Sequence, residues 1–501
     1  MSIDDTYDKL IERLREMYEL SSAASILSWD QRVNMPPGGA KLRSRQQSRL
    51  EELVHRRKTD PELRELINKL HDHREDLSFD RRVVVRETKK EVDRAHKLPS
   101  EFVAEKSRVT SEAYNVWTEA KRNNDLESFL PYLEKNVSLA REEADYIGYE
   151  DSPYDPLLDQ YDPGMTESRI ATLFDELRSK LVPVVDRIKA SDVRPPTEEK
   201  VTGQSWSTDR QEDVGEAFVR QIGYDMDEGR IDTTEHPFCS GYVGDVRITT
   251  RYNNSNPFVS LTSLLHEAGH ALYEQGLDPD TWGTPLSEPV GMGVHESQSR
   301  LWENMVGRSD AFWAWAWPKF QEAFPDKTTD MTRDELLFIL HDSQPGFIRV
   351  EADEVTYNLH VILRFELERE LLHNELEPEQ LPDAWNAKMD ELLGIEPPDH
   401  RQGVLQDVHW SSGAFGYFPS YAIGNLLAAQ VFQAAEEDVG PFDDAFSSGN
   451  FEPLLSWLRG EIHQRGKRYR TDELTEEVTG SPLQVDPFIE HVKSSYLPYY
   501  E

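Results

Sequence analysis

Apolar residues recur at helical spacing through the first third of the chain. They fall at positions i, i+3 and i+4, which places them on one face of a helix, with polar residues between them. Pro61, Pro99 and Pro131 lie near the starts of segments, where a helix tolerates proline. The pattern predicts helices at residues 5–25, 41–56, 61–72, 78–98, 100–122 and 126–146.

Patterns typical of strands are rare. The best candidate is Val246–Tyr252, which is rich in β-branched residues and follows a turn region at Gly241–Gly244. The preceding stretch, His236–Tyr242, is placed to pair with it across that turn. We therefore predict a mostly α fold with a small antiparallel β-sheet near residue 240.

Turn-forming residues cluster in three later stretches, at 151–165, 191–204 and 395–403. The composition is the same on both sides of each stretch, so they do not mark domain boundaries. We expect a single large domain over residues 1–501, with an N-terminal helical part of about 1–150 and a core of about 230–430.

The charge of the chain excludes several classes of protein. The sequence has 94 Asp and Glu against 55 Lys and Arg, a net charge of −39, whereas a nucleic-acid binder needs a basic surface. The one cysteine, Cys239, excludes an intramolecular disulfide framework and is interpreted as an inert thiol. No apolar run of about 18 residues exists and the N-terminus is acidic, so neither a membrane span nor a secretory signal is predicted. We expect a cytoplasmic protein.

The basic residues are also unevenly chosen, with 18 Lys against 37 Arg. A surface rich in carboxylates and poor in lysine resembles proteins that work in molar intracellular salt. At 1 M salt the Debye length is about 3 Å, so repulsion between the acidic groups is largely screened. We interpret the composition as halophilic adaptation, which says where the protein works and not what it does.

A metal-binding motif stands out at residues 266–270, which read His-Glu-Ala-Gly-His. The motif lies in an apolar helical segment that is predicted to stop at Gly276. Positions i and i+4 of a helix share a face, so His266 and His270 can bind one ion. Glu267 then lies beside the ion and not on it. This is the zinc-peptidase arrangement of two histidine ligands and a glutamate general base.

A catalytic zinc ion usually has a third protein ligand and an open position for water. A downstream helical segment, 291–303, offers two candidates, Glu296 and His295. Glu296 completes a His-His-Glu set suited to hydrolysis. The spacing alone does not separate the two residues.

These motifs and three further blocks resemble the carboxypeptidase Taq family of metallocarboxypeptidases, over about residues 29 to 425. The resemblance implies a gluzincin-like fold with a long substrate groove, covered by the N-terminal helical part. It also implies a homodimer that removes C-terminal residues one at a time, with one divalent ion per chain, zinc or cobalt. The blocks are Asp245-Val-Arg247-Ile-Thr249, His266–His270, His295-Glu296-Ser-Gln, Ile348–Asp353 and Gly403–Trp410.

The resemblance also assigns roles to residues. It favours Glu296 as the third ligand, and it implies that Arg349, Gln406 and His409 recognise the free C-terminal carboxylate of a peptide. A guanidinium suits that task because it can bind both carboxylate oxygens, but Arg401 is a rival that the sequence does not exclude.

Two further roles follow from residue type. Tyr417 is a candidate hydrogen-bond donor to the oxyanion, in competition with Tyr421. Asp245, Arg247 and Thr249 alternate along the predicted strand and share one face. They are expected to hold an extended peptide, although an internal Asp–Arg pair is nearly as good an interpretation.

We therefore expect a zinc metallocarboxypeptidase of broad specificity, in which Glu267 is the general base. An oligopeptidase that cuts internal bonds of short peptides is the alternative. A metal-binding or peptide-binding module without activity is a third possibility, against which the intact Glu267 argues.

Overall fold

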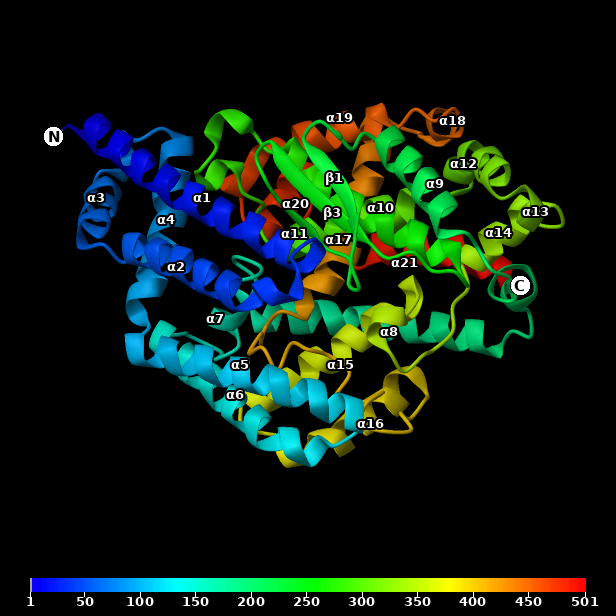
Figure 1. Ribbon diagram of the computed structural model, residues 1–501, viewed down its shortest axis with the longest axis horizontal. Helices are drawn as coiled ribbons and strands as arrows, with labels where there is room; N and C mark the ends of the chain where they lie inside the picture. The colour runs from blue at the N-terminus through cyan, green and yellow to red at the C-terminus, as the bar shows by residue number, and fades with distance from the viewer. Residues whose placement is uncertain (1) are drawn as a thin grey trace.

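Helices form most of the structure, a computed structural model in which residues 2–501 are described (Figure 1). The six helices predicted for the first third of the chain are all present, and α3 has the predicted bounds. They are α1 (Ile3–Val33), α2 (Ala40–Lys58), α3 (Pro61–Asp72), α4 (Phe79–Lys97), α5 (Ser100–Asn123) and α6 (Leu126–Ile147).

The remaining helices follow the same order along the chain. They are α7 (Asp155–Leu158), α8 (Glu167–Ala190), α9 (Thr208–Gln221), α10 (Pro257–Gly276), α11 (Met292–Arg300), α12 (Asp310–Ala323), α13 (Pro325–Thr328), α14 (Arg333–Leu340), α15 (Glu354–Leu372), α16 (Leu381–Leu393), α17 (Pro419–Val439), α18 (Asp443–Ser447), α19 (Glu452–Glu461), α20 (Thr471–Thr479) and α21 (Asp486–Tyr496). α10 contains the His-Glu-Ala-Gly-His motif and ends at the predicted stop, Gly276.

α1 runs beyond its predicted end at residue 25. Its start is fixed by a capping box, in which the Ser2 hydroxyl accepts the Asp5 N–H and the Asp5 carboxylate accepts the Ser2 N–H. The later part has little apolar periodicity, and it is held by contact with α2, where Arg43 donates to Asp30 at 2.5 Å. Tertiary contact, which periodicity does not report, therefore extends this helix.

The small sheet is mixed and not antiparallel throughout. Its strands are β1 (Gly229–Thr233), β2 (Cys239–Tyr242) and β3 (Asp245–Thr250), in the order β1-β3-β2. β2 and β3 form the predicted antiparallel pair, joined by a tight turn in which Gly244 has a φ of +81°. β1 pairs with β3 in parallel, so β3 is the central strand. β1 is short and polar and shows no alternation of burial, which explains why the pattern did not predict it.

The sheet packs on α10, so it supports the helix that carries the motif (Figure 1). Val246 and Ile248 of β3 are fully buried in the main hydrophobic core. That core extends through α10, α11, α15 and α17, and it makes the chain a single large domain. A second, smaller core joins α1, α3 and α4. None of the helices in residues 2–501 has both the length and the apolar character needed to cross a membrane.

α10 and α11 approach closely at Gly269. A Cβ atom there would lie 2.6 Å from the carbonyl oxygen of Gln298 and 2.6 Å from Cα of Ser299. Because both obstacles are backbone atoms, Gly269→Ala is expected to lower the free energy of unfolding by about 1–3 kcal/mol, measured by chemical denaturation.

Gly460→Ala is the matched control, because Gly460 lies in α19 and nothing stands within 4 Å of its added Cβ. Alanine is favoured over glycine in a helix, so this variant is expected to be as stable as the parent or up to about 1 kcal/mol more stable. Equal stability of the two variants would contradict the close approach of α10 and α11.

Candidate metal centre and active site

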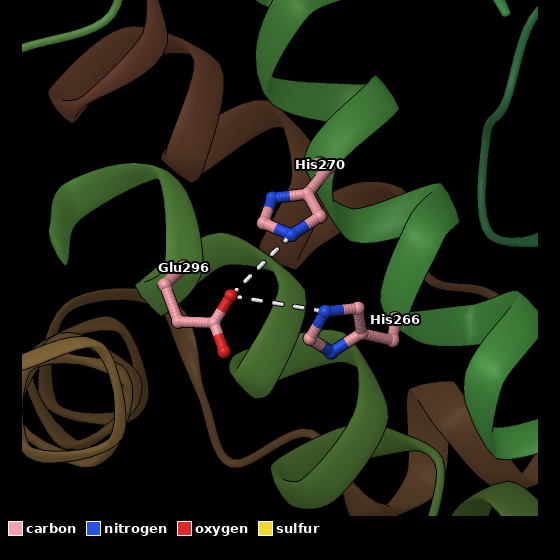
Figure 2. Close-up of side chains that lie close together, drawn as sticks. All are labelled: His266, His270 and Glu296. Carbon is pink, nitrogen blue, oxygen red and sulfur yellow. Dashed lines mark ion pairs between the residues drawn. The ribbon is translucent and has the colours of Figure 1, made fainter. Parts of the chain in front are cut away.

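Two helices bring three metal-binding side chains together. His266 and His270 lie one turn apart on α10, and Glu296 projects from α11 towards them (Figure 2). Oε2 of Glu296 lies 3.7 Å from Nε2 of His266 and 3.4 Å from Nε2 of His270. The three ligand atoms all lie within 4.8 Å of one another, which is a spacing that one ion can bridge.

The outer nitrogens of both imidazoles are engaged elsewhere. Nδ1 of His266 lies 2.9 Å from the Glu303 carboxylate, and Nδ1 of His270 lies 3.1 Å from the backbone carbonyl of His295. With each Nδ1–H donated outward, both Nε2 atoms present lone pairs to a carboxylate oxygen. Three acceptors then converge with no proton between them, and a cation is the group that satisfies all three. The donor set therefore fits a divalent metal, with Glu303 orienting one of its ligands.

Glu296 is fixed by its neighbours so that one oxygen is available. Arg300 donates to Oε1 at 2.8 Å, which leaves Oε2 towards the two histidines. Burial alone would raise the pKa of Glu296, but Arg300 and the histidines hold it well below its ordinary value. Gly424 of α17 lies against this side chain, and an added Cβ would come within 2.4 Å of Cγ of Glu296.

His295, the rival third ligand, lies on the outer side of this group. Its Nε2 lies 2.9 Å from Oε1 of Glu274, and its Nδ1 contacts the outer nitrogen of His270, not the ligand nitrogen, at 2.5 Å. The His-His-Glu group that can hold a metal in the described residues consists of His266, His270 and Glu296.

Glu267 is separate from the ligands and faces the cavity. Its side chain lines a cavity of about 520 Å³ together with His266, His270 and Glu296. It is only 7% exposed, and no other described residue donates a hydrogen bond to it. Burial raises the pKa of Glu267 to about 7. A carboxylate of this kind can exchange a proton with a water molecule in the cavity.

Arg349 supplies a cation to the same cavity. Its Nε and Nη2 donate to Oδ1 of Asp407 at 3.0 and 2.9 Å, and its Nη1 donates to the Tyr357 hydroxyl at 2.7 Å. The Gln406 side chain accepts the backbone N–H of Arg349 at 2.9 Å, so it fixes the segment and does not line the cavity. Arg401, the rival cation, is half-exposed, pairs with Asp399, and is not among the residues that line the cavity.

The aromatic side of the cavity is formed by tyrosines. Tyr417 and Tyr421 both line it. His409 stands behind them, with its Nε2 3.1 Å from the Tyr421 hydroxyl. Burial lowers the pKa of His409 to about 3, so this imidazole is neutral at neutral pH. Burial also raises the pKa of the Tyr417 hydroxyl, which therefore keeps its proton.

The strand residues expected to touch substrate are not brought to the cavity. Arg247 forms a two-point ion pair with Asp245, at 2.6 Å for each contact, and its guanidinium stacks on the Trp29 ring at 4.6 Å. Thr249 is fully buried and hydrogen-bonds with the backbone of Phe238. The structure therefore places Asp245 and Arg247 in an internal pair that contacts α1, and Thr249 in the interior of the sheet region. Alternation along a strand showed that they share a face, but not what covers that face.

Several residues of the site were not singled out from the sequence. Glu303 lies two helical turns after Glu296, and that spacing could have indicated it as a partner of the same centre. Asp407 lies inside a block that was recognised, but its pairing with Arg349 was not predicted. Arg364 and Tyr357 carried no sequence signal, because only the fold brings α15 against the 403–410 segment.

Comparisons with known proteins identify the family of the chain. The family model of carboxypeptidase Taq (M32) metallopeptidases matches residues 9–496. The chain is 41% identical to thermostable carboxypeptidase 1 of Thermus thermophilus, in an alignment that covers 100% of each protein. It is 38% identical to carboxypeptidase 1 of Bacillus subtilis, with 99% of each covered.

Solved structures give the same result. An M32 carboxypeptidase from Deinococcus radiodurans superposes with a TM-score of 0.96 at 40% identity, over 99% of both chains. Metallocarboxypeptidase 1 of Trypanosoma cruzi gives a TM-score of 0.94 at 34% identity, over 99% of this chain and 100% of the other. The chain thus belongs to the carboxypeptidase Taq (M32) family of metallopeptidases and is a peptide hydrolase.

Proposed function

We propose that this protein is a zinc metallocarboxypeptidase of broad specificity that removes the C-terminal residue from peptides with a free carboxylate. The observation that carries the proposal is the content of one cavity. The His-His-Glu group, the carboxylate of Glu267 and the guanidinium of Arg349 all line it. These are the parts that hydrolysis of the last peptide bond needs: a metal site, a proton acceptor and a cation for the terminal carboxylate.

His266, His270 and Glu296 would hold one divalent ion, zinc or alternatively cobalt. Such an ion lowers the pKa of water and polarises the scissile carbonyl. Glu267 takes the proton of the attacking water and delivers it to the leaving amine. Both transfers are open to this carboxylate, because it faces the cavity beside the metal site and no other described residue donates a hydrogen bond to it.

Tyr417 is proposed as the donor to the oxyanion. Its hydroxyl lines the cavity and has no hydrogen-bond partner among the described residues, so it is free to turn towards substrate. The Tyr421 hydroxyl is already engaged by His409. A protonated phenol aimed at the developing negative charge stabilises the transition state.

Arg349 is proposed to read the terminal carboxylate. Three of its five N–H groups are used by Asp407 and Tyr357, which leaves one on each Nη atom. Two N–H groups on the two ends of a guanidinium match the two oxygens of a carboxylate. Gln406 and His409 would act indirectly, through Arg349 and Tyr421.

The backbone of the substrate is assigned to β2 and not to β3. β3 is the central strand, so both its edges are occupied. β2 is an edge strand, and Cys239 at its start lines the cavity with Pro237 and Phe238. An extended peptide can pair with such an edge through main-chain hydrogen bonds.

Arg349→Met is expected to lower kcat/KM for peptides with a free C-terminus by about 100-fold, because two charge-assisted hydrogen bonds are lost. The amidated form of the same peptide should change little. Asp407 keeps its pairing with Arg364, so the variant is expected to fold. Steady-state kinetics on a matched acid and amide pair is the measurement.

Arg401→Met serves as the control, since this half-exposed residue pairs with Asp399 outside the cavity. It should behave like the parent on both peptides. If Arg401→Met no longer preferred the acid to the amide while Arg349→Met still did, Arg401 and not Arg349 would be the residue that binds the terminal carboxylate.

The halophilic character of the protein is a further proposal, supported by the net charge of −39. The Debye length falls from about 10 Å at 0.1 M to about 3 Å at 1 M salt, so repulsion among carboxylates weakens. Tm is therefore expected to rise as KCl is increased from about 0.1 M to about 2 M, as followed by thermal unfolding. A Tm that is flat or falls over this range would contradict the proposal.

The homodimer is proposed on the resemblance to the family alone. If the protein is a homodimer, light scattering coupled to size-exclusion chromatography should give twice the mass of one chain. The cytoplasmic location stays a prediction from the sequence.

A further inference from the structure

Asp407 lies between two guanidinium groups. Its Oδ1 accepts hydrogen bonds from Arg349, at 2.9 Å for the shorter contact, and its Oδ2 accepts one from Nε of Arg364 at 2.6 Å. The side chains of Arg349, Asp407 and Arg364 are 5%, 9% and 0% exposed. Two cations share one anion in a place that water hardly reaches, so the group carries an excess positive charge.

The two imidazoles nearest to this group do not offset its charge. His360 and His409 are neutral, because burial lowers the pKa of both imidazoles below the neutral range. Lys121 faces Asp407 and adds positive charge, with its ammonium on the backbone carbonyl of Gln406 at 2.8 Å.

Glu368, one turn beyond Arg364 on α15, is the remaining acid. It accepts hydrogen bonds from Tyr154, Trp410 and the Gly416 N–H, and none from Arg364. Burial raises its pKa to about 7, so its carboxylate offsets part of the positive charge of Arg364 at neutral pH, and Arg349, on the cavity side, keeps its own charge.

Arg364 is also rigidly held. Its Nη1 donates to the backbone carbonyl of His360 at 2.7 Å, and its guanidinium lies 4.5 Å from the centre of the Trp385 ring. Burial lowers its pKa to about 10, which still leaves it cationic at neutral pH. Arg364 does not line the cavity, so it cannot touch a substrate there.

The consequence concerns the charge that a substrate meets. A buried pair of Arg349 and Asp407 alone would be neutral, and a carboxylate that approached it would gain little. When Arg364 shares Asp407, the group is left one positive charge in excess. A buried excess charge is unfavourable until an anion pairs with it. The carboxylate of a peptide is an anion that can reach Arg349 from the cavity.

We propose that Arg364 is a positioning residue for carboxylate recognition: it binds the second oxygen of Asp407, and so keeps Arg349 both fixed and cationic towards the substrate. The inference rests on the proposed function, in which Arg349 reads the C-terminus. It adds a residue that acts only through Asp407.

The test compares kcat/KM for one peptide as the free acid and as the amide. The quantity of interest is the acid-to-amide ratio, kcat/KM for the acid divided by kcat/KM for the amide. In Arg364→Met the excess charge is gone, so this ratio is expected to fall by about 10-fold to 100-fold, through a higher KM for the acid. The amidated C-terminus carries no charge, so kcat/KM for the amide should stay the same. General damage to the fold would lower both values together and leave the ratio unchanged.

Three further variants make the test decisive. Arg364→Met combined with Asp407→Asn leaves Arg349 as the only charge, so most of the ratio should return. Arg364→Lys keeps a cation beside Asp407 but loses the two-point contact and the ring stacking of the guanidinium, so its ratio should lie between those of the parent and of Arg364→Met. Arg369→Met is the control on the same helix, since Arg369 pairs with Glu167 away from the cavity, and its ratio should equal that of the parent.

The outcomes separate this inference from the proposed function. A parent protein with a ratio near one would refute carboxylate recognition itself. A parent with a high ratio and a folded Arg364→Met protein with the same ratio would overturn only the role of Arg364. If circular dichroism shows that Arg364→Met does not fold, Arg364→Gln takes its place in the comparison, and a folded Arg364→Gln protein with the ratio of the parent overturns the role of Arg364 equally.

Discussion

The Glu267→Gln protein is expected to bind metal like the parent and to lose about 10²–10⁴-fold in kcat. Glutamine has nearly the same shape but cannot accept a proton. Glu267 lines the cavity, is not one of the three ligands, and has no hydrogen bond to another described residue that the change would break. The loss should therefore appear in kcat, with KM and metal content almost unchanged.

The measurement pairs steady-state kinetics with metal analysis by mass spectrometry on the same sample. Glu274→Gln is a suitable control, because Glu274 lies two turns further along α10, pairs with His295 and does not itself line the cavity. It should keep most of the activity. Full activity in Glu267→Gln with bound metal would remove Glu267 from its role as general base.

The second large effect is expected when a ligand is removed. His270→Ala leaves two of the three donors, so the protein should lose its metal and, with it, nearly all activity. A ligand that binds only the folded state stabilises it by about 4 kcal/mol at a thousand times its Kd. A chelator should therefore lower the Tm of the parent and leave the Tm of His270→Ala unchanged.

His295→Ala is the matched control for this experiment. The side chain of His295 pairs with Glu274, and the backbone carbonyl of His295 that accepts from His270 is kept by the substitution. The variant should hold metal as the parent does. A His295→Ala protein without metal, together with a Glu296→Gln protein that retains it, would make His295 the third ligand.

The local parts of the fold could be predicted well from the sequence. Apolar spacing predicted α3 with its observed bounds, because that helix has a regular apolar face over its whole length. The strand β1 was missed, because four of its five residues, Gly229–Thr233, are glycine or polar, and the strand takes its place from pairing with β3. The sheet is consequently mixed where an antiparallel one was expected.

In the candidate site, too, features set by local sequence could be predicted and features set by tertiary contacts could not. His266 and His270 belong to one helix, so their spacing alone was enough to place them on one face. Asp245 and Arg247 were placed on one face equally well, but the sequence did not show that Trp29 of α1 covers it. The pairing of Asp407 with Arg364 depends on how α15 packs on a distant loop. Periodicity carries no information about contacts of that kind.

The most direct test of the central claim is mass spectrometry of a mixed peptide pool after incubation with the purified protein. Half of the peptides have free C-termini and half are amidated, with zinc and cobalt in parallel tubes. The buffer contains about 2–3 M KCl to screen the acidic surface. We predict ladders shortened residue by residue from the free C-termini only. Cleavage of amidated peptides at internal bonds, at the same rate, would contradict the account and establish an oligopeptidase.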